Sequence, residues 1–213
     1  MILEDTLKIK KFFEQTASVG VIDDERIILL KSIALKIHEV NQQTKDATYL
    51  NFICTHNSRR SQLAQVWAYF AASYFDLPTI KAYSGGTAVT AFFKNTVKTL
   101  QAAGFHFNVE KFNHQNPTYA ITFDDKHKAL LGFSKLYDDK SNVNPFIAIT
   151  TCSSADENCP FIPNAIFRFH LPYKDPKESD NTRFEAEAYL KTNSQIAAEI
   201  YFLFQEIQKL HLN

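Results

Sequence analysis

The sequence predicts an α/β fold: a doubly wound, mostly parallel four-stranded sheet flanked by helices, with an α-helical extension at the N-terminus. Short apolar runs typical of buried strands alternate with longer segments in which apolar residues recur every three or four positions. This alternation is characteristic of a parallel sheet that carries helices on its faces. Strands are expected at 49–54, 79–84, 145–151 and 166–171.

The first 46 residues are expected to form two helices with a break at Gly20. Apolar side chains such as Phe13 and Ile33 recur at helical spacing and give each helix one apolar face. We interpret residues 1–46 as an N-terminal helical extension and residues 47–213 as the main domain, which should carry any active site.

The remaining elements follow from periodicity and breakers. Helices are expected from near Ser61, over 89–103 and over 181–210. Residues 118–123 and 133–138 read as two further strands, with the stretch KHKALLG between them as a turn. The 145–151 strand should be central, near the first strand.

Composition excludes several classes of protein. Of the 213 residues, 45% are hydrophobic, which suffices for a packed core, and the formal net charge is zero. No overall basic character favours nucleic acid or an anionic membrane, and no apolar run is long enough to span a bilayer. The N-terminus lacks the apolar core of a signal peptide, so a cytoplasmic location is expected. The oligomeric state stays open.

A cysteine, five residues and an arginine follow the first strand, in the stretch CTHNSRRS. Cys54 should lie at the carboxyl end of its strand, where open α/β sheets bind ligands. The following turn leads into a helix N-terminus, whose N–H groups and dipole bind oxyanions and stabilise a thiolate. Arg60 can hold two anion oxygens with its planar fork, and Ser61 can hydrogen-bond the sulfur. The expected oxyanion-binding residues are Thr55, His56, Asn57, Ser58, Arg59, Arg60 and Ser61, with Asn57 also bracing the loop.

The other two cysteines, Cys152 and Cys159, stand in TTCSSADENCPFIP, directly after the 145–151 strand. Their spacing does not fit a zinc knuckle, and no histidine pair lies close enough to complete a site, so no metal is expected. Taken alone, the pair is equally compatible with ordinary loop residues and with reactive thiols. The Ser, Asp and Asn content of the segment predicts a loop, or a short helix that can unwind.

These motifs together resemble the low-molecular-weight protein tyrosine phosphatase superfamily, whose loop reads C-x5-R-[ST]. Asn57-Ser58 and Ser61-Gln62 are similar to its thioredoxin-coupled arsenate reductase branch, whose loop reads CTGNSCRSQ. Two positions depart, because His56 replaces a glycine and Arg59 replaces a small residue or cysteine. A histidine at 56 would be strained if the loop requires a positive φ there.

The segment CSSADENCP resembles the redox pair of those reductases. The resemblance implies that Cys54, Cys152 and Cys159 form a relay that reduces arsenate, and that thioredoxin regenerates the relay. No bound cofactor is implied.

The general acid is implied at Asp175 of the Asp-Pro pair in YKDPKESD. Ser84 matches a serine that supports the loop or a bound cation in the reductases. Gln65 stands where an acid is often found, which leaves a potassium site in question.

Three functions are compatible with these motifs. The first is arsenate reduction by the three cysteines. The second is hydrolysis of a phosphotyrosine or other aryl phosphate by Cys54, Arg60 and Asp175. The third is a non-catalytic oxyanion-binding protein, against which the intact set of Cys, Arg, Ser and Asp argues. The CSSADENC pair favours reduction.

Overall fold

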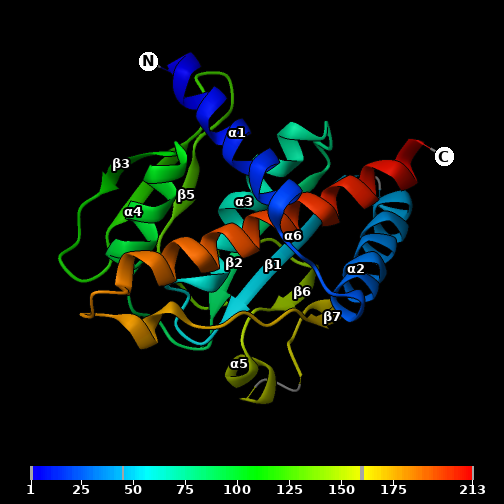
Figure 1. Cartoon of the computed structure of the whole chain (residues 1–213). Coiled ribbons are helices and arrows are strands. Elements are labelled where there is room, and N and C mark those ends of the chain that lie inside the picture. Colours follow the sequence, from blue (N-terminus) through cyan, green and yellow to red (C-terminus); the bar gives the residue numbers. More distant parts are fainter. Residues whose placement is uncertain (1, 45, 159–160, 213) are drawn as a thin grey trace.

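The computed structural model describes residues 2–44, 46–158 and 161–212. Its central sheet holds β1 (Thr48–Cys54), β2 (Ile80–Gly86), β6 (Phe146–Thr150) and β7 (Ala165–His170), in the order β2-β1-β6-β7. All three pairings are parallel (Figure 1). The predicted four-stranded α/β fold is therefore confirmed, including the central position of β6 beside β1.

The sheet divides the hydrophobic residues between its two faces, since alternate side chains of a strand point to opposite sides. Ile147 and Ile149 of β6 belong to the large core, whereas Phe146 and Ala148 belong to a smaller cluster that also holds Cys54. The large core lies beneath α3 (Arg60–Tyr74), α4 (Lys94–Ala103) and α6 (Glu185–Leu212). The smaller cluster includes Ala155 of α5 (Ser153–Asn158).

The N-terminal extension consists of α1 (Ile2–Val19) and α2 (Asp24–Gln43), as predicted. Both helices pack on α6, which runs diagonally across the molecule in Figure 1. Phe13 of α1 is fully buried and stacks on Trp67 of α3, with ring centroids 5.3 Å apart. The extension therefore shares the large core with the rest of the chain. No helix in the described ranges combines the length and apolarity that crossing a membrane requires.

The region 105–143 departs from the prediction. It holds an antiparallel sheet of β3 (His106–Lys111), β4 (Thr118–Thr122) and β5 (Leu130–Gly132). Only the strand at 118–123 was expected. The predicted turn contains β5, and the predicted strand over 133–138 forms one isolated bridge, between Gly86 and Leu136. The backbone of this segment pairs with β2 only at Gly86, and the Phe133 carbonyl and Lys135 N bond Gln62 and Asn57 instead.

Two predicted helices begin later than expected. α4 begins at Lys94 rather than 89, because Thr90 and Phe93 direct their backbone N–H groups to Ser134 and Ser58. α6 begins at Glu185 rather than 181, because Asn181 adopts a left-handed φ of 60°. The loop between β7 and α6 contains η1 (Pro176–Ser179), a short 3-10 helix.

Candidate active site

The Cys54 loop lies where the strand order of the sheet reverses. β1 is paired with β2 on one side and with β6 on the other. The connection from β1 to β2 and the later connection into β6 therefore run to opposite sides of β1. This topology opens a crevice at the carboxyl end of β1, as in other doubly wound sheets. Cys54 is the last residue of β1, and α3 begins six residues later at Arg60.

Cys54 is nearly buried, with 3% of its surface exposed, and its Sγ lies 3.1 Å from Ser61 Oγ. Ser61 Oγ also accepts a hydrogen bond of 2.9 Å from Asn57 Nδ2. Because Asn57 supplies that donor, the Ser61 hydroxyl hydrogen is free to point at the sulfur. This arrangement suits a thiolate, which can only accept a hydrogen bond.

Asn57 holds the loop in shape. It adopts a left-handed φ of 45°, which asparagine tolerates better than most residues. Its Oδ1 accepts hydrogen bonds from Lys135 N at 3.0 Å and from Gln62 Nε2 at 3.1 Å. The left-handed position of the loop is thus 57 rather than 56, and His56 is not strained in the way that a positive φ would require.

Arg60 points toward the loop after β7. Its Nη1 donates to the Tyr173 carbonyl at 3.1 Å, and its Nη2 lies 2.5 Å from Asp175 Oδ2. Its Nε is buried and has no hydrogen-bond partner among the described residues. A buried donor without a partner is costly, so an anion seated on the guanidinium would relieve that cost.

The Arg59 side chain is held by residues outside the Cys54 loop, so its guanidinium is already engaged in this structure. Its Nε donates to Tyr189 Oη at 2.7 Å, and its Nη2 to Asp180 Oδ2 at 2.9 Å, while its guanidinium covers the Phe93 ring at 4.1 Å. Burial opposes its charge, but the Tyr189 bond and the two nearby aspartates leave its pKa raised. Arg59 thus ties the Cys54 loop to the loop that carries Asp175.

The remaining loop residues border a small cleft of about 220 Å³ that His56, Ser58, Arg59, Thr90, Ala91, Phe93 and Lys177 line. His56 is exposed there, and its carbonyl accepts hydrogen bonds from Ser134 and Thr90. Thr55 lies on the other side of the loop, where its Oγ1 is 3.5 Å from Cys152 Sγ. The mouth of the site is therefore cationic and partly aromatic.

Cys152 is brought to the Cys54 loop from the end of β6. It is 2% exposed, shares a buried cluster with Cys54, and accepts a hydrogen bond from Ala155 N at 3.4 Å. Both thiols are free. α5 is fastened by Asp156, which accepts hydrogen bonds from Thr150 at 2.7 Å and Arg168 at 2.6 Å. Cys159 lies outside the described residues.

Asp175 precedes the short helix η1 and caps it by accepting a hydrogen bond from Lys177 N at 3.1 Å. Its carboxylate is shared between Arg60, at 2.5 Å, and Arg59, at 4.0 Å. Ser84 is fully buried, but its hydroxyl donates to Gln65 Oε1 at 2.5 Å. Any support that Ser84 gives the loop is therefore indirect.

Sequence reasoning missed Arg26, which anchors the acid loop from the N-terminal extension. Arg26 Nη2 donates to the Pro172 carbonyl at 2.9 Å, and its guanidinium lies 4.9 Å from the centre of the Tyr173 ring. Its Nε donates to Glu199 Oε2 at 2.9 Å. No local pattern identifies such a residue, because its partners lie more than 140 positions away.

Comparisons with known proteins agree with this fold and loop, although no family model matches the chain. An arsenate reductase of Bacillus subtilis (strain 168) is 27% identical over 142 residues, which span 66% of this chain and 82% of that protein. A solved low-molecular-weight protein tyrosine phosphatase from T. tengcongensis superposes with a TM-score of 0.51 at 17% identity, covering 75% of this chain and 99% of that one. A low-molecular-weight phosphotyrosine phosphatase from Vibrio cholerae O395 gives a TM-score of 0.50 at 14% identity, with coverages of 77% and 99%.

The chain thus has the fold of the low-molecular-weight protein tyrosine phosphatases. Within that class its sequence is similar to arsenate reductases, so the resemblance noted in the motifs is confirmed.

Proposed function

We propose that this chain is a cysteine-nucleophile enzyme that reduces arsenate to arsenite through Cys54, Cys152 and Cys159, with thioredoxin as the reductant. The contact of Cys152 Sγ with Thr55 Oγ1 carries the proposal, because it places a second thiol against the loop of the first. Hydrolysis of a phosphate ester requires only the Cys54 thiol and does not involve Cys152. The similarity to arsenate reductases supports the same choice of substrate.

Arsenate would be captured by the N–H groups at the start of α3 and by the Arg60 guanidinium. The Arg60 Nε that lacks a partner among the described residues supplies one donor. An incoming dianion would also compete with Asp175 for Nη2 and release that carboxyl group. Asp175 would then stand next to the leaving oxygen, where a general acid is needed.

In the redox steps Cys54 thiolate forms a sulfur–arsenic bond, and one oxygen of arsenate leaves as water. Cys152 then attacks Cys54 Sγ, which makes a disulfide while the sulfur–arsenic electron pair stays on arsenic as arsenite departs. Cys159 attacks Cys152, frees Cys54 and leaves a Cys152–Cys159 disulfide, which the thioredoxin dithiol reduces. The net reaction consumes one arsenate and one dithiol, and gives arsenite, water and one disulfide.

These steps require α5 to rearrange, because Cys152 must reach Cys54 and later Cys159, and a disulfide needs Cα atoms within ~7 Å. α5 is only six residues long. Among the described residues it is anchored by the contacts of Asp156 with Thr150 and Arg168. A cytoplasmic location, where thiols are kept reduced, is part of this proposal.

Phosphatase activity is the second candidate, because Cys54, Arg60 and Asp175 alone would suffice for it. The two solved structures described above, which share the fold, are phosphatases. In this case Asp175 would protonate the phenol leaving group, and water would hydrolyse the phosphocysteine. Cys152 and Cys159 would take no part.

Arsenate-dependent NADPH oxidation, with thioredoxin and thioredoxin reductase supplied, separates the two functions. A reductase turns over steadily, and Cys152→Ser and Cys159→Ser both abolish the turnover. Hydrolysis of an aryl phosphate, run on the same variants, is the matched control. Full hydrolysis by both variants with no NADPH oxidation by the natural sequence would establish the phosphatase instead. Cys54→Ser should abolish either activity.

A further inference from the structure

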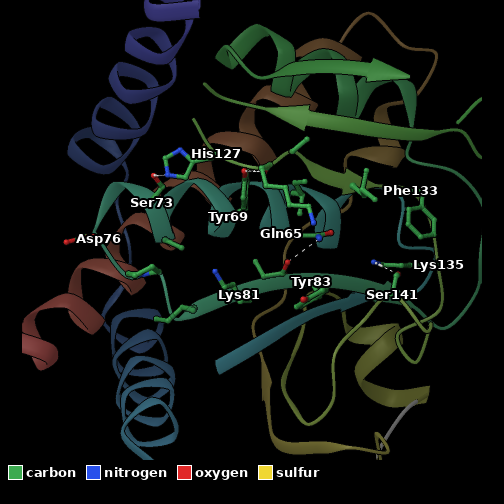
Figure 2. Close-up of a pocket in the computed structure, with 18 residues that line it drawn as sticks. Gln65, Tyr69, Ser73, Asp76, Lys81, Tyr83, His127, Phe133, Lys135 and Ser141 are labelled. Carbon is green, nitrogen blue, oxygen red and sulfur yellow. Dashed lines mark hydrogen bonds between the residues drawn. The ribbon is translucent and has the colours of Figure 1, made fainter. Parts of the chain in front are cut away.

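A second pocket, of about 530 Å³, lies between α3, β2 and the segment 127–135 (Figure 2). Its volume is within the range of pockets that bind small molecules. None of the residues assigned to oxyanion chemistry lines it. The walls are largely apolar and aromatic, and they include Tyr69, Ala72, Ile80, Tyr83, Leu130 and Phe133.

The charged lining of this pocket is mainly cationic. Lys81, Lys128 and Lys135 line it, against a single carboxylate, Asp76. The imidazole of His127 is already bonded to Asp124 at 2.8 Å and to Ser73 at 3.0 Å. The lining therefore favours an anionic group on an otherwise apolar ligand.

Lys135 is the unusual member of the set. It is only 4% exposed, its Nζ donates to Ser141 Oγ at 3.0 Å, and the Phe133 ring centre lies 4.9 Å away. Figure 2 shows Lys135 and Ser141 side by side at the edge of the pocket. Among the described residues Lys135 forms no ion pair, although buried lysines are normally paired. Burial lowers the pKa of Lys135 to about 8, with Asp139 opposing that shift.

We propose that this pocket binds a small aromatic carboxylate, whose carboxyl group pairs with the Lys135 ammonium and whose ring lies against Tyr69, Tyr83 and Phe133. The anion would give the buried ammonium a direct ion pair, whereas Ser141 lies between it and the Asp139 carboxylate. An aromatic body fits because the walls offer rings on two sides, and stacked or edge-on ring contacts add to burial of the apolar surface.

Such a ligand would be coupled to the Cys54 loop through residues 133–135. The Phe133 carbonyl accepts from Gln62 at 2.8 Å, Ser134 Oγ donates to the His56 carbonyl at 2.8 Å, and Lys135 N donates to Asn57. Side chains of the same short segment face the pocket. Binding in the pocket and binding of an oxyanion should therefore affect each other. This coupling rests on the proposed function, whereas binding in the pocket does not.

The test is calorimetric titration of the full chain with 2-naphthoate at pH 7, with neutral 2-naphthamide as the matched probe. We expect 2-naphthoate to bind with a submillimolar dissociation constant and the amide at least about tenfold more weakly, as for loss of a charged hydrogen bond. Lys135→Met should weaken 2-naphthoate by about the same factor. Lys98→Met, at an exposed position of α4, should leave it unchanged. Equal binding of acid and amide, or no effect of Lys135→Met, would overturn the proposal.

Three further measurements locate the ligand and test the coupling. Chemical shifts in the natural sequence should move at Lys135, Tyr83 and Leu131 on adding 2-naphthoate, and Cys54→Ser should retain its binding. Shifts confined to 54–61, with displacement by inorganic phosphate alone, would mean that 2-naphthoate occupies the oxyanion loop and would overturn the pocket. Saturating 2-naphthoate should change the phosphate dissociation constant by about fivefold, and an unchanged value would refute the coupling.

Discussion

Replacing Arg26 by methionine should lower the free energy of unfolding by about 3–5 kcal/mol, the range for removing one partner of a buried ion pair. The Arg26 and Glu199 side chains are only 14% and 4% exposed, and their nearest charged atoms lie 2.8 Å apart. Methionine keeps most of the packing against Tyr173 but leaves the Glu199 carboxylate buried without its cation. The Pro172 carbonyl also loses its donor.

Urea denaturation of the natural sequence, Arg26→Met, Glu199→Gln and the double variant measures this effect. Because most of the cost is the uncompensated carboxylate, adding Glu199→Gln to Arg26→Met should restore part of the lost stability. Phosphate affinity should fall as well, since Arg26 fixes the loop whose Tyr173 carbonyl positions Arg60. A loss below about 1 kcal/mol for Arg26→Met, with no recovery in the double variant, would refute this account of the extension.

Three further predictions concern the loop and the pocket. Asn57→Ala should cost about 2–3 kcal/mol of stability by urea denaturation, since it removes three side-chain bonds and puts alanine at a φ of 45°; a neutral effect would contradict the bracing role. Arg60→Lys should weaken phosphate at least about tenfold by calorimetry, since an ammonium lacks the two-pronged geometry; equal affinity would argue against Arg60 as the ligand. Lys135, with its folded pKa of about 8 against an ordinary 10.5, binds fewer protons when folded than when unfolded between those values. Its contribution to stability therefore rises with pH across that window, and Lys135→Met should remove this rise, measured as the difference from the natural sequence. An identical pH dependence of the two proteins would contradict the depressed pKa.

Local sequence patterns predicted the strand, loop and helix around Cys54, because all three depend on residues close together in the chain. The apolar run of β1, the cysteine at its end and the period of α3 lie within 48–74. The packing of β6 beside β1 was also predictable, because a buried parallel strand has few other places in a doubly wound sheet.

Contacts between distant segments were not predictable in the same way. The direction of Arg59 depends on Tyr189 and Asp180, more than 120 positions along the chain. Residues 133–138 alternate like a strand, but 133–135 bond Asn57, Gln62 and His56, and pairing of the segment with β2 is confined to Gly86. Hydrogen bonds to distant residues, and not the intrinsic strand preference of the segment, determine its conformation.

In the proposed reaction, Cys152 attacks Cys54 Sγ, breaks the sulfur–arsenic bond and displaces arsenite. The most direct test of this step is a single turnover of Cys159→Ser, reduced and then mixed with arsenate in the absence of thioredoxin. The account predicts one arsenite released per protein molecule and a Cys54–Cys152 disulfide, identified by mass spectrometry of the unreduced peptides. Free thiols at both positions and no arsenite, in protein that still hydrolyses an aryl phosphate, would contradict it.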